Sequence, residues 1–312
     1  MTTIFFATDV HGSEICWKKF INAGKFYNAD ILVLGGDMTG KALVPFIRDS
    51  KGMYKVNFLE EEMLLDDEGK TRMMKNISDR GYYPLDLTDD EFDELNADQE
   101  KVEKIFVKHV LDMAERWVAF ADEKLAGTGI KCFVCPGNDD MFEIDAVLES
   151  SKSIIMAEGK ILDLDGHYNM LSTGWSNPTP WDTHRECSEE EITEKIEAMA
   201  SKISDINRCV FNLHAPPFGS GLDEAPELDE NLRPKYAGRS LIPVGSTAVR
   251  DAILKYQPPL ALTGHIHEGR GIKRMKKTFV VNPGSSYEQS TLLGAVIEMD
   301  KKGVTKYILT SG

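Results

Sequence analysis

The chain has no run of about 20 consecutive apolar residues, which is the length that a membrane-spanning helix requires. Cysteine is also scarce: the chain has five, an odd number among 312 residues, which does not indicate the disulfide framework of a small secreted domain. The first residues include no basic segment and no small-residue cleavage site, so we expect no signal peptide. Together these absences predict a cytoplasmic protein without a membrane partner.

The chain has fewer basic than acidic residues. The 36 Lys and Arg residues stand against 51 Asp and Glu residues, which leaves a net charge of −15. Proteins that bind nucleic acid draw most of their affinity from Lys and Arg contacts to the phosphate backbone, so a polynucleotide partner and a repair-type nuclease activity are both disfavoured. A small anionic substrate remains compatible with this charge if bound cations dominate the field of the site.

Short apolar runs alternate with segments of helical periodicity. The runs are almost continuously hydrophobic, as expected of strands buried on both faces. They span residues 4–7, 31–34, 130–134, 209–213 and 260–262. Between these runs lie amphipathic segments such as 192–203, which follows a capping box formed by Ser188 and Glu191. This alternation predicts an α/β fold of packed layers.

One long segment interrupts the alternation. About ninety residues separate the second run from the third, whereas a plain βαβ unit needs about thirty in total. The segment has the pattern of a hairpin near residues 54–58 and of a long helix over 98–125. We therefore predict one domain over 1–312 with an inserted hairpin-plus-helix subdomain at 49–127. The insertion is interpreted either as a packing elaboration or as a cap over the active site.

Each of the five apolar runs is followed by side chains that bind metal ions in other proteins. In chain order these are Asp9 and His11, Asp37, Asn138, His214, and the pair His265 and His267. In open α/β sheets the carboxyl ends of the strands form one edge, and ligands bind there. Imidazole and carboxylate without thiolate suit Mn, Fe, Zn or Ni. Seven groups are too many for one tetrahedral ion, and two ions about 3.5–4 Å apart are the usual arrangement for displacement at phosphorus.

The order of these motifs resembles the signature of the calcineurin-like metallophosphoesterase superfamily, over nearly the whole chain outside the insertion. The matching motifs are Asp9-x-His11, Gly36-Asp37, Gly137-Asn138, His214 and Gly264-His265-x-His267. The resemblance implies a four-layer fold of two packed β-sheets flanked by helices. It also implies one metal ion held by Asp9, His11, Asp37 and His267, and a second held by Asp37, as the bridge, with Asn138, His214 and His265.

The chain departs from the family at one position. The family has Gly-Asn-His-Asp, with a His that contacts substrate and assists the leaving group, whereas this chain has Gly137-Asn138-Asp139-Asp140. Asp139 is either a replacement acid or a bystander, and repulsion between a carboxylate and a phosphate favours the bystander. We predict a phosphodiesterase, with a phosphomonoesterase as the alternative. A non-catalytic scaffold of the same fold is expected to lose metal ligands, but all seven are present.

Two further segments are candidates for substrate contact. Trp175, Asn177 and Trp181 lie in a turn-rich segment that either lines a pocket or anchors its loop to the core. Arg233 and Arg239 lie in an otherwise acidic segment. They either clamp a phosphate or, as we favour, only balance the neighbouring carboxylates in solvent.

Overall fold

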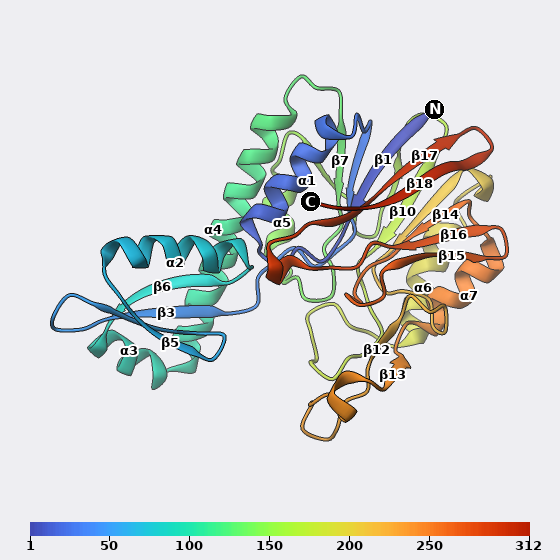
Figure 1. Ribbon diagram of the computed structural model, residues 1–312. Coiled ribbons are helices and arrows are strands. Elements are labelled where there is room, and N and C mark those ends of the chain that lie inside the picture. The colour runs from blue at the N-terminus through green and yellow to red at the C-terminus, as the bar shows by residue number, and fades with distance from the viewer.

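Two six-stranded β-sheets form the body of the molecule in a computed structural model that describes residues 1–312 (Figure 1). The first sheet has the order β18 (Gly303–Ser311), β17 (Leu293–Asp300), β1 (Thr2–Ala7), β2 (Ile31–Leu34), β7 (Lys131–Val134) and β8 (Ile154–Met156). The second has the order β15 (Gly271–Met275), β16 (Thr278–Asn282), β14 (Leu260–Leu262), β11 (Cys209–Leu213), β10 (Asn169–Thr173) and β9 (Ile161–Asp163).

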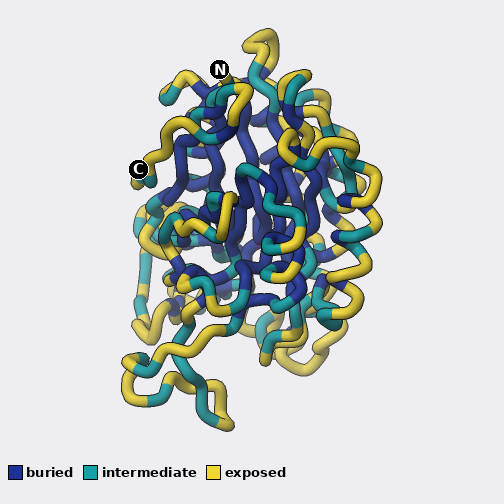
Figure 2. Tube along the Cα trace, turned by 90° about the vertical axis from the view of Figure 1, so that its right-hand side faces the viewer, coloured by how far each residue is buried: buried dark blue, intermediate teal, exposed yellow.

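The two sheets pack face to face and each carries helices on its other side. Alternate residues of β1 show this, because Phe6 belongs to the cluster between the sheets while Phe5 belongs to the cluster under the helices. Helices α1 (Glu14–Phe26), α4 (Gln99–Leu125) and α5 (Ile144–Glu149) cover the first sheet, and α6 (Glu189–Ala200) and α7 (Thr247–Tyr256) cover the second. Figure 2 shows the buried residues concentrated along the strands of the body. The predicted fold of two packed sheets flanked by helices is confirmed.

The insertion is larger than the predicted hairpin and helix. It contains a four-stranded sheet with the order β5 (Glu61–Leu65), β4 (Tyr54–Phe58), β3 (Leu43–Arg48) and β6 (Tyr83–Thr88), and helices α2 (Asp67–Asp79) and α3 (Asp89–Asn96). The predicted hairpin corresponds to β4 with its neighbours. Strands β3 and β6 escaped the sequence pattern because each has an interior proline, Pro45 and Pro84, and proline argues against a strand.

Helix α4 joins the inserted sheet to the body. The small sheet projects to one side of the body (Figure 1) and has its own core, which includes Phe46 and Val56. The second half of α4 instead packs into the core of the body, where the Trp117 ring stacks on the Trp17 ring at 4.8 Å between centroids. None of the helices, α4 included, combines the length and the apolar character needed to cross a membrane.

Candidate metal centre

The seven predicted metal ligands meet at one edge of the two sheets. Strands β1, β2 and β7 run parallel in the first sheet and β11 and β14 run parallel in the second, so their carboxyl ends fall on common edges. The His214 ring links the two edges, because its Nδ1 lies 3.0 Å from the Gly35 carbonyl oxygen. Within the second sheet, the Gly264 N–H donates to the His214 carbonyl at 2.8 Å.

The backbone of the ligand-bearing loops is strained. Asp9, His11, Asp37 and His265 have φ angles of 53°, 38°, 50° and 65°, a region that residues with a side chain seldom adopt. Gly36 has a φ of 142°, and a Cβ atom there would lie 2.1 Å from His214 Nδ1. Such conformations persist only where surrounding contacts enforce them, and they concentrate at functional sites. The strain aims the ligand side chains at one another.

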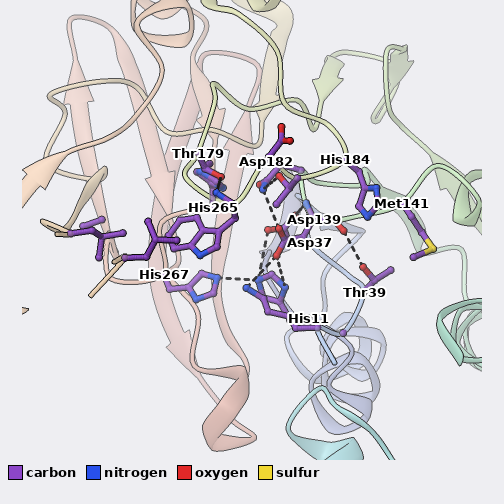
Figure 3. Close-up of a pocket in the computed structure, with 18 of the residues that line it drawn as sticks. His11, Asp37, Thr39, Asp139, Met141, Thr179, Asp182, His184, His265 and His267 are labelled. Carbon is purple, nitrogen blue, oxygen red and sulfur yellow. Dashed lines mark hydrogen bonds and ion pairs between the residues drawn. The ribbon is translucent and has the colours of Figure 1, made fainter. Parts of the chain in front are cut away.

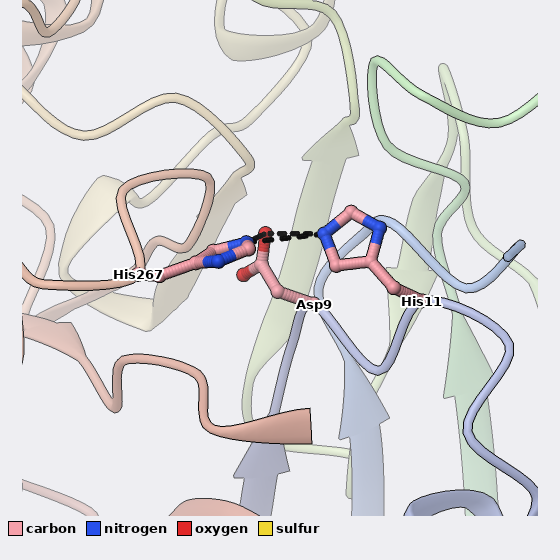
Figure 4. A group of neighbouring side chains, drawn as sticks. All are labelled: Asp9, His11 and His267. Atoms are coloured by element: carbon pink, nitrogen blue, oxygen red, sulfur yellow. Dashed lines mark hydrogen bonds and ion pairs between the residues drawn. The ribbon is translucent and has the colours of Figure 1, made fainter. Parts of the chain in front are cut away.

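The first group of ligands is Asp9, His11 and His267, drawn in Figure 4. His267 Nε2 lies 3.5 Å from Asp9 Oδ1, and it lies 3.1 Å from His11 Nε2. Asp9 and His11 are almost completely buried. Burial lowers the pKa of His11, and the charge of Lys41 lowers it further. His11 is therefore neutral near pH 7, which is the form that binds a metal ion.

The second group is Asp37, His214 and His265. Asp37 Oδ2 lies 3.3 Å from His214 Nε2, and Asn138 Oδ1 lies 3.0 Å from the same nitrogen. Burial lowers the pKa of His265 to about 4, and the charge of His214 acts in the same direction. Burial also disfavours charge on His214, but the carboxylates of Asp37 and Asp9 outweigh it and raise the pKa of His214 to about 10.

These residues fit a pair of divalent metal ions. Each group converges three nitrogen or oxygen donors with no sulfur, as Mn, Fe or Zn sites with imidazole and carboxylate do. Asp37 lies between the groups, with Oδ2 also 3.7 Å from His11 Nε2. Metal-binding histidines usually donate their second ring N–H to a carbonyl or carboxylate, and His214 Nδ1 faces the Gly35 carbonyl in that way.

Asp139 also points into this centre (Figure 3). Its Oδ2 lies 3.6 Å from His11 Nδ1, and its backbone N–H donates to Asp37 Oδ1 at 3.0 Å. It forms a further candidate ligand group with His11 and Asp37. The next residue, Asp140, is fully buried and accepts hydrogen bonds from the backbone N–H groups of Met38 and Thr39, which fixes two ligand loops against each other.

A cleft of ≈ 710 Å³ opens over the centre. His11, Asp37, Asn138, Asp139, His265 and His267 line its floor. Its walls are mixed. Their polar side chains include Lys41, Asp182 and Glu268, and their apolar ones are Phe106, Met141, Ala225, Pro226, Leu228, Leu232 and Pro234, with the exposed ring of Trp181. Phe106 comes from α4, so the predicted insertion contributes to one wall of the cleft. Whether the insertion limits access stays a prediction.

Of the five predicted substrate-contacting residues, the structure brings Trp181 alone to the cleft. Trp175 packs beside Phe142 and under the Lys195 ammonium, 4.1 Å from its ring centroid. Asn177 anchors its loop by donating to the Val244 carbonyl at 3.1 Å. Arg233 and Arg239 are exposed in the loop that joins β12 (Glu224–Pro226) to β13 (Leu241–Pro243) and do not line the cleft. The positions of these four residues do not support a contact with substrate.

Two residues that the sequence did not single out lie in the site. Lys41 Nζ lies 3.2 Å from Asp139 Oδ2. Burial disfavours its charge, but Asp139 and Asp37 outweigh burial and raise the pKa of Lys41. Thr183 Oγ1 accepts a hydrogen bond from Asn138 Nδ2 at 2.8 Å, which turns the amide oxygen of Asn138 toward His214. The sequence signal for Lys41 is only its position shortly after Asp37, and Thr183 has none.

Comparison with known proteins shows relatives of the chain and of its fold. No family model matches the chain. The uncharacterized protein MJ1162 of Methanocaldococcus jannaschii is 32% identical over 165 residues, which are 52% of this chain and 68% of that protein. The solved structure of TT1561 of Thermus thermophilus aligns over 100% of this chain and 98% of its own, with a TM-score of 0.50 and 14% identity. A novel archaeal phosphodiesterase aligns over 99% of this chain and 100% of its own, with a TM-score of 0.37 and 9% identity, too weak a likeness for any conclusion.

Proposed function

We propose that this chain is a dinuclear metal-dependent phosphodiesterase for a small anionic substrate. The chain belongs to the family of MJ1162 and has the calcineurin-like metallophosphoesterase fold. One observation carries the proposal. The Asp37 carboxylate lies between two buried groups of nitrogen and oxygen donors, with Oδ2 3.3 Å from His214 Nε2 and 3.7 Å from His11 Nε2. A carboxylate in this position can serve two ions at once, as a two-metal site for phosphoester hydrolysis can use.

The residues divide into two ligand sets. Asp9, His11 and His267 would hold one ion and Asn138, His214 and His265 the other, with Asp37 shared between them. Two such ions supply a hydroxide nucleophile and neutralise charge on the reacting phosphoryl oxygens. The chain orients the ligands itself, because the Gly35 carbonyl fixes the His214 ring and Thr183 fixes the Asn138 amide.

The preference for diesters rests on Asp139. General acid assistance matters most for poor leaving groups. In a protein that lacks the family His, substrates with good leaving groups should therefore lose the least hydrolysis rate. A diester also carries one negative charge fewer than a monoester and is repelled less by the Asp139 carboxylate. Lys41, 3.2 Å from the Asp139 carboxylate, offsets part of this repulsion.

Two alternatives make different predictions. A phosphomonoesterase would share every metal ligand and differ only in how it treats the leaving group. A non-catalytic scaffold of the same fold would have no reason to keep all seven ligands, four of them in a strained backbone conformation, so the φ angles of Asp9, His11, Asp37 and His265 favour an enzyme. We expect a small phosphoester as substrate and no polynucleotide, in keeping with the net charge of −15.

Metal content and hydrolysis test the proposal together. Purified protein reconstituted with Mn²⁺, Fe²⁺ or Zn²⁺ is analysed for bound metal, then assayed with bis(p-nitrophenyl) phosphate and p-nitrophenyl phosphate. We expect two ions per chain and faster diester hydrolysis, and we expect Asp37→Asn to reduce both. The control is Asp93→Asn, which changes an exposed carboxylate on α3. One ion or fewer in the reconstituted wild-type protein contradicts the two-metal proposal.

A further inference from the structure

Lys41 is the one Lys or Arg residue among those that line the cleft. Its ammonium lies 3.2 Å from Asp139 Oδ2, and its side chain is 46% exposed. The same Asp139 oxygen lies 3.6 Å from His11 Nδ1. The chain thus places a positive charge directly beside the metal centre, within a protein that carries 51 acidic and 36 basic residues.

The backbone before Lys41 is held rigidly. The Gly40 N–H donates to the Tyr83 hydroxyl at 2.7 Å, and the Thr39 N–H donates to the Asp140 carboxylate at 2.8 Å. Gly40 also packs against the backbone of the insertion, because a Cβ atom there would lie 2.3 Å from the Gly81 carbonyl oxygen. The side chain of Lys41 therefore starts from a fixed point at the cleft, which is how proteins preorganise a group that contacts a ligand.

Charge and hydrogen-bonding capacity both suit an anionic ligand. An ammonium group has three N–H donors, and the ion pair with Asp139 uses one of them. The donors that remain can reach a phosphate oxygen in the cleft. The carboxylates of Asp139, Asp182 and Glu268, which are not among the seven predicted metal ligands, also line this cleft, and Lys41 is the lining side chain that opposes their charge.

We propose that Lys41 binds a non-bridging oxygen of the substrate phosphoryl group, and that the Lys41–Asp139 pair stands where the family has its histidine. This inference rests on the proposed function. Lys41 supplies the positive charge near the phosphoryl group that the missing His would bring, and Asp139 positions the ammonium. In this arrangement Asp139 acts through Lys41 and is a positioning residue.

The test uses the binding of inorganic phosphate to the metal-loaded protein, measured by isothermal titration calorimetry, so that it does not depend on turnover. Losing a charge-assisted hydrogen bond should weaken phosphate binding about 10- to 100-fold in Lys41→Met, while the metal content stays at that of the wild type. Lys41→Arg should restore most of the affinity. In Asp139→Asn the ammonium is no longer neutralised, and phosphate should bind more tightly than in the wild type.

Lys101→Met is a matched control. Lys101 is also 46% exposed and also forms an ion pair at 3.2 Å, with Glu94, but it lies outside the cleft. The phosphate affinity of the Lys101→Met variant should equal that of the wild type. Unchanged phosphate binding in Lys41→Met overturns the inference, and so does a loss of metal from that variant, which would make Lys41 a support of the metal site. If phosphate binding depends on Lys41 but no ester is hydrolysed, the hydrolase proposal fails, and Lys41 is a phosphate-binding residue of a protein with another function.

Discussion

Replacing Asp139 with His should raise the hydrolysis of monoesters relative to diesters. The change removes a carboxylate whose Oδ2 lies 3.6 Å from His11 Nδ1, at the edge of the metal centre. One unit charge about 4 Å away contributes about 1 kcal/mol in bulk water and about 4 kcal/mol in the less polar surroundings of a protein. Lys41 lies 3.2 Å from the same carboxylate and already cancels part of this field. The lower end applies, so the ratio of monoester to diester kcat/KM should rise about fivefold.

The assay separates charge from the leaving group. p-Nitrophenyl phosphate and bis(p-nitrophenyl) phosphate share a leaving group, so their ratio reports the charge. An alkyl monoester such as glycerol 2-phosphate reports the new general acid, which contributes about 10²–10⁴-fold where it works. Asp182→His, which removes a carboxylate elsewhere in the cleft, is the control. An unchanged ratio in Asp139→His refutes the reasoning. Loss of all activity in Asp139→Ala would instead make the carboxylate a working acid or a metal ligand.

Further predictions concern the metal site, the core and the insertion. Because carboxylates raise the pKa of His214 to about 10, its ring is protonated at pH 7 and must lose a proton to bind a metal ion. The affinity for the metal ion should therefore rise with pH, and calorimetry in two buffers should show proton release. Gly36→Ala, whose Cβ would lie 2.1 Å from His214 Nδ1, should lower the melting temperature and the metal content together. Trp117→Ala should lower the free energy of unfolding, measured in urea, by about 3–5 kcal/mol, because the ring is buried against Trp17. The metal content should not change, because Trp117 is not a metal ligand. Phe106→Ala should leave a small chromogenic diester unaffected and change selectivity among larger esters, and unchanged selectivity would favour a packing role for the insertion.

The fold and the ligands could be predicted because their signals are local in the sequence. Each ligand directly follows a buried apolar run, and parallel strands bring such ends to one edge whatever the length of the connections between them. Residues 31–34 and Asp37 are an example, since β2 spans Ile31–Leu34 as expected. The capping box of Ser188 and Glu191 is another, because both of its hydrogen bonds are present at the start of α6.

The walls of the cleft could not be predicted in this way. Trp175 and Trp181 lie in the same turn-rich segment, yet one ring packs on Phe142 and the other faces the cleft. Composition does not distinguish them, since the direction of a loop side chain depends on what the loop packs against. Arg233 and Arg239 were considered for their charge alone, and the loop that carries them exposes both to solvent.

Lys41 shows why the missing histidine could not be interpreted from the sequence. With only Gly137-Asn138-Asp139-Asp140 in view, the substitution places a negative charge where a substrate anion must bind, and repulsion makes Asp139 a bystander. The structure adds an ammonium 3.2 Å from that carboxylate, carried by a different loop. The ion pair repels a phosphate less than the carboxylate alone would, and its ammonium keeps donors free for a phosphate oxygen. The chemistry of position 139 therefore belongs to two residues, and only the packing of the loops after β2 and β7 brings them together.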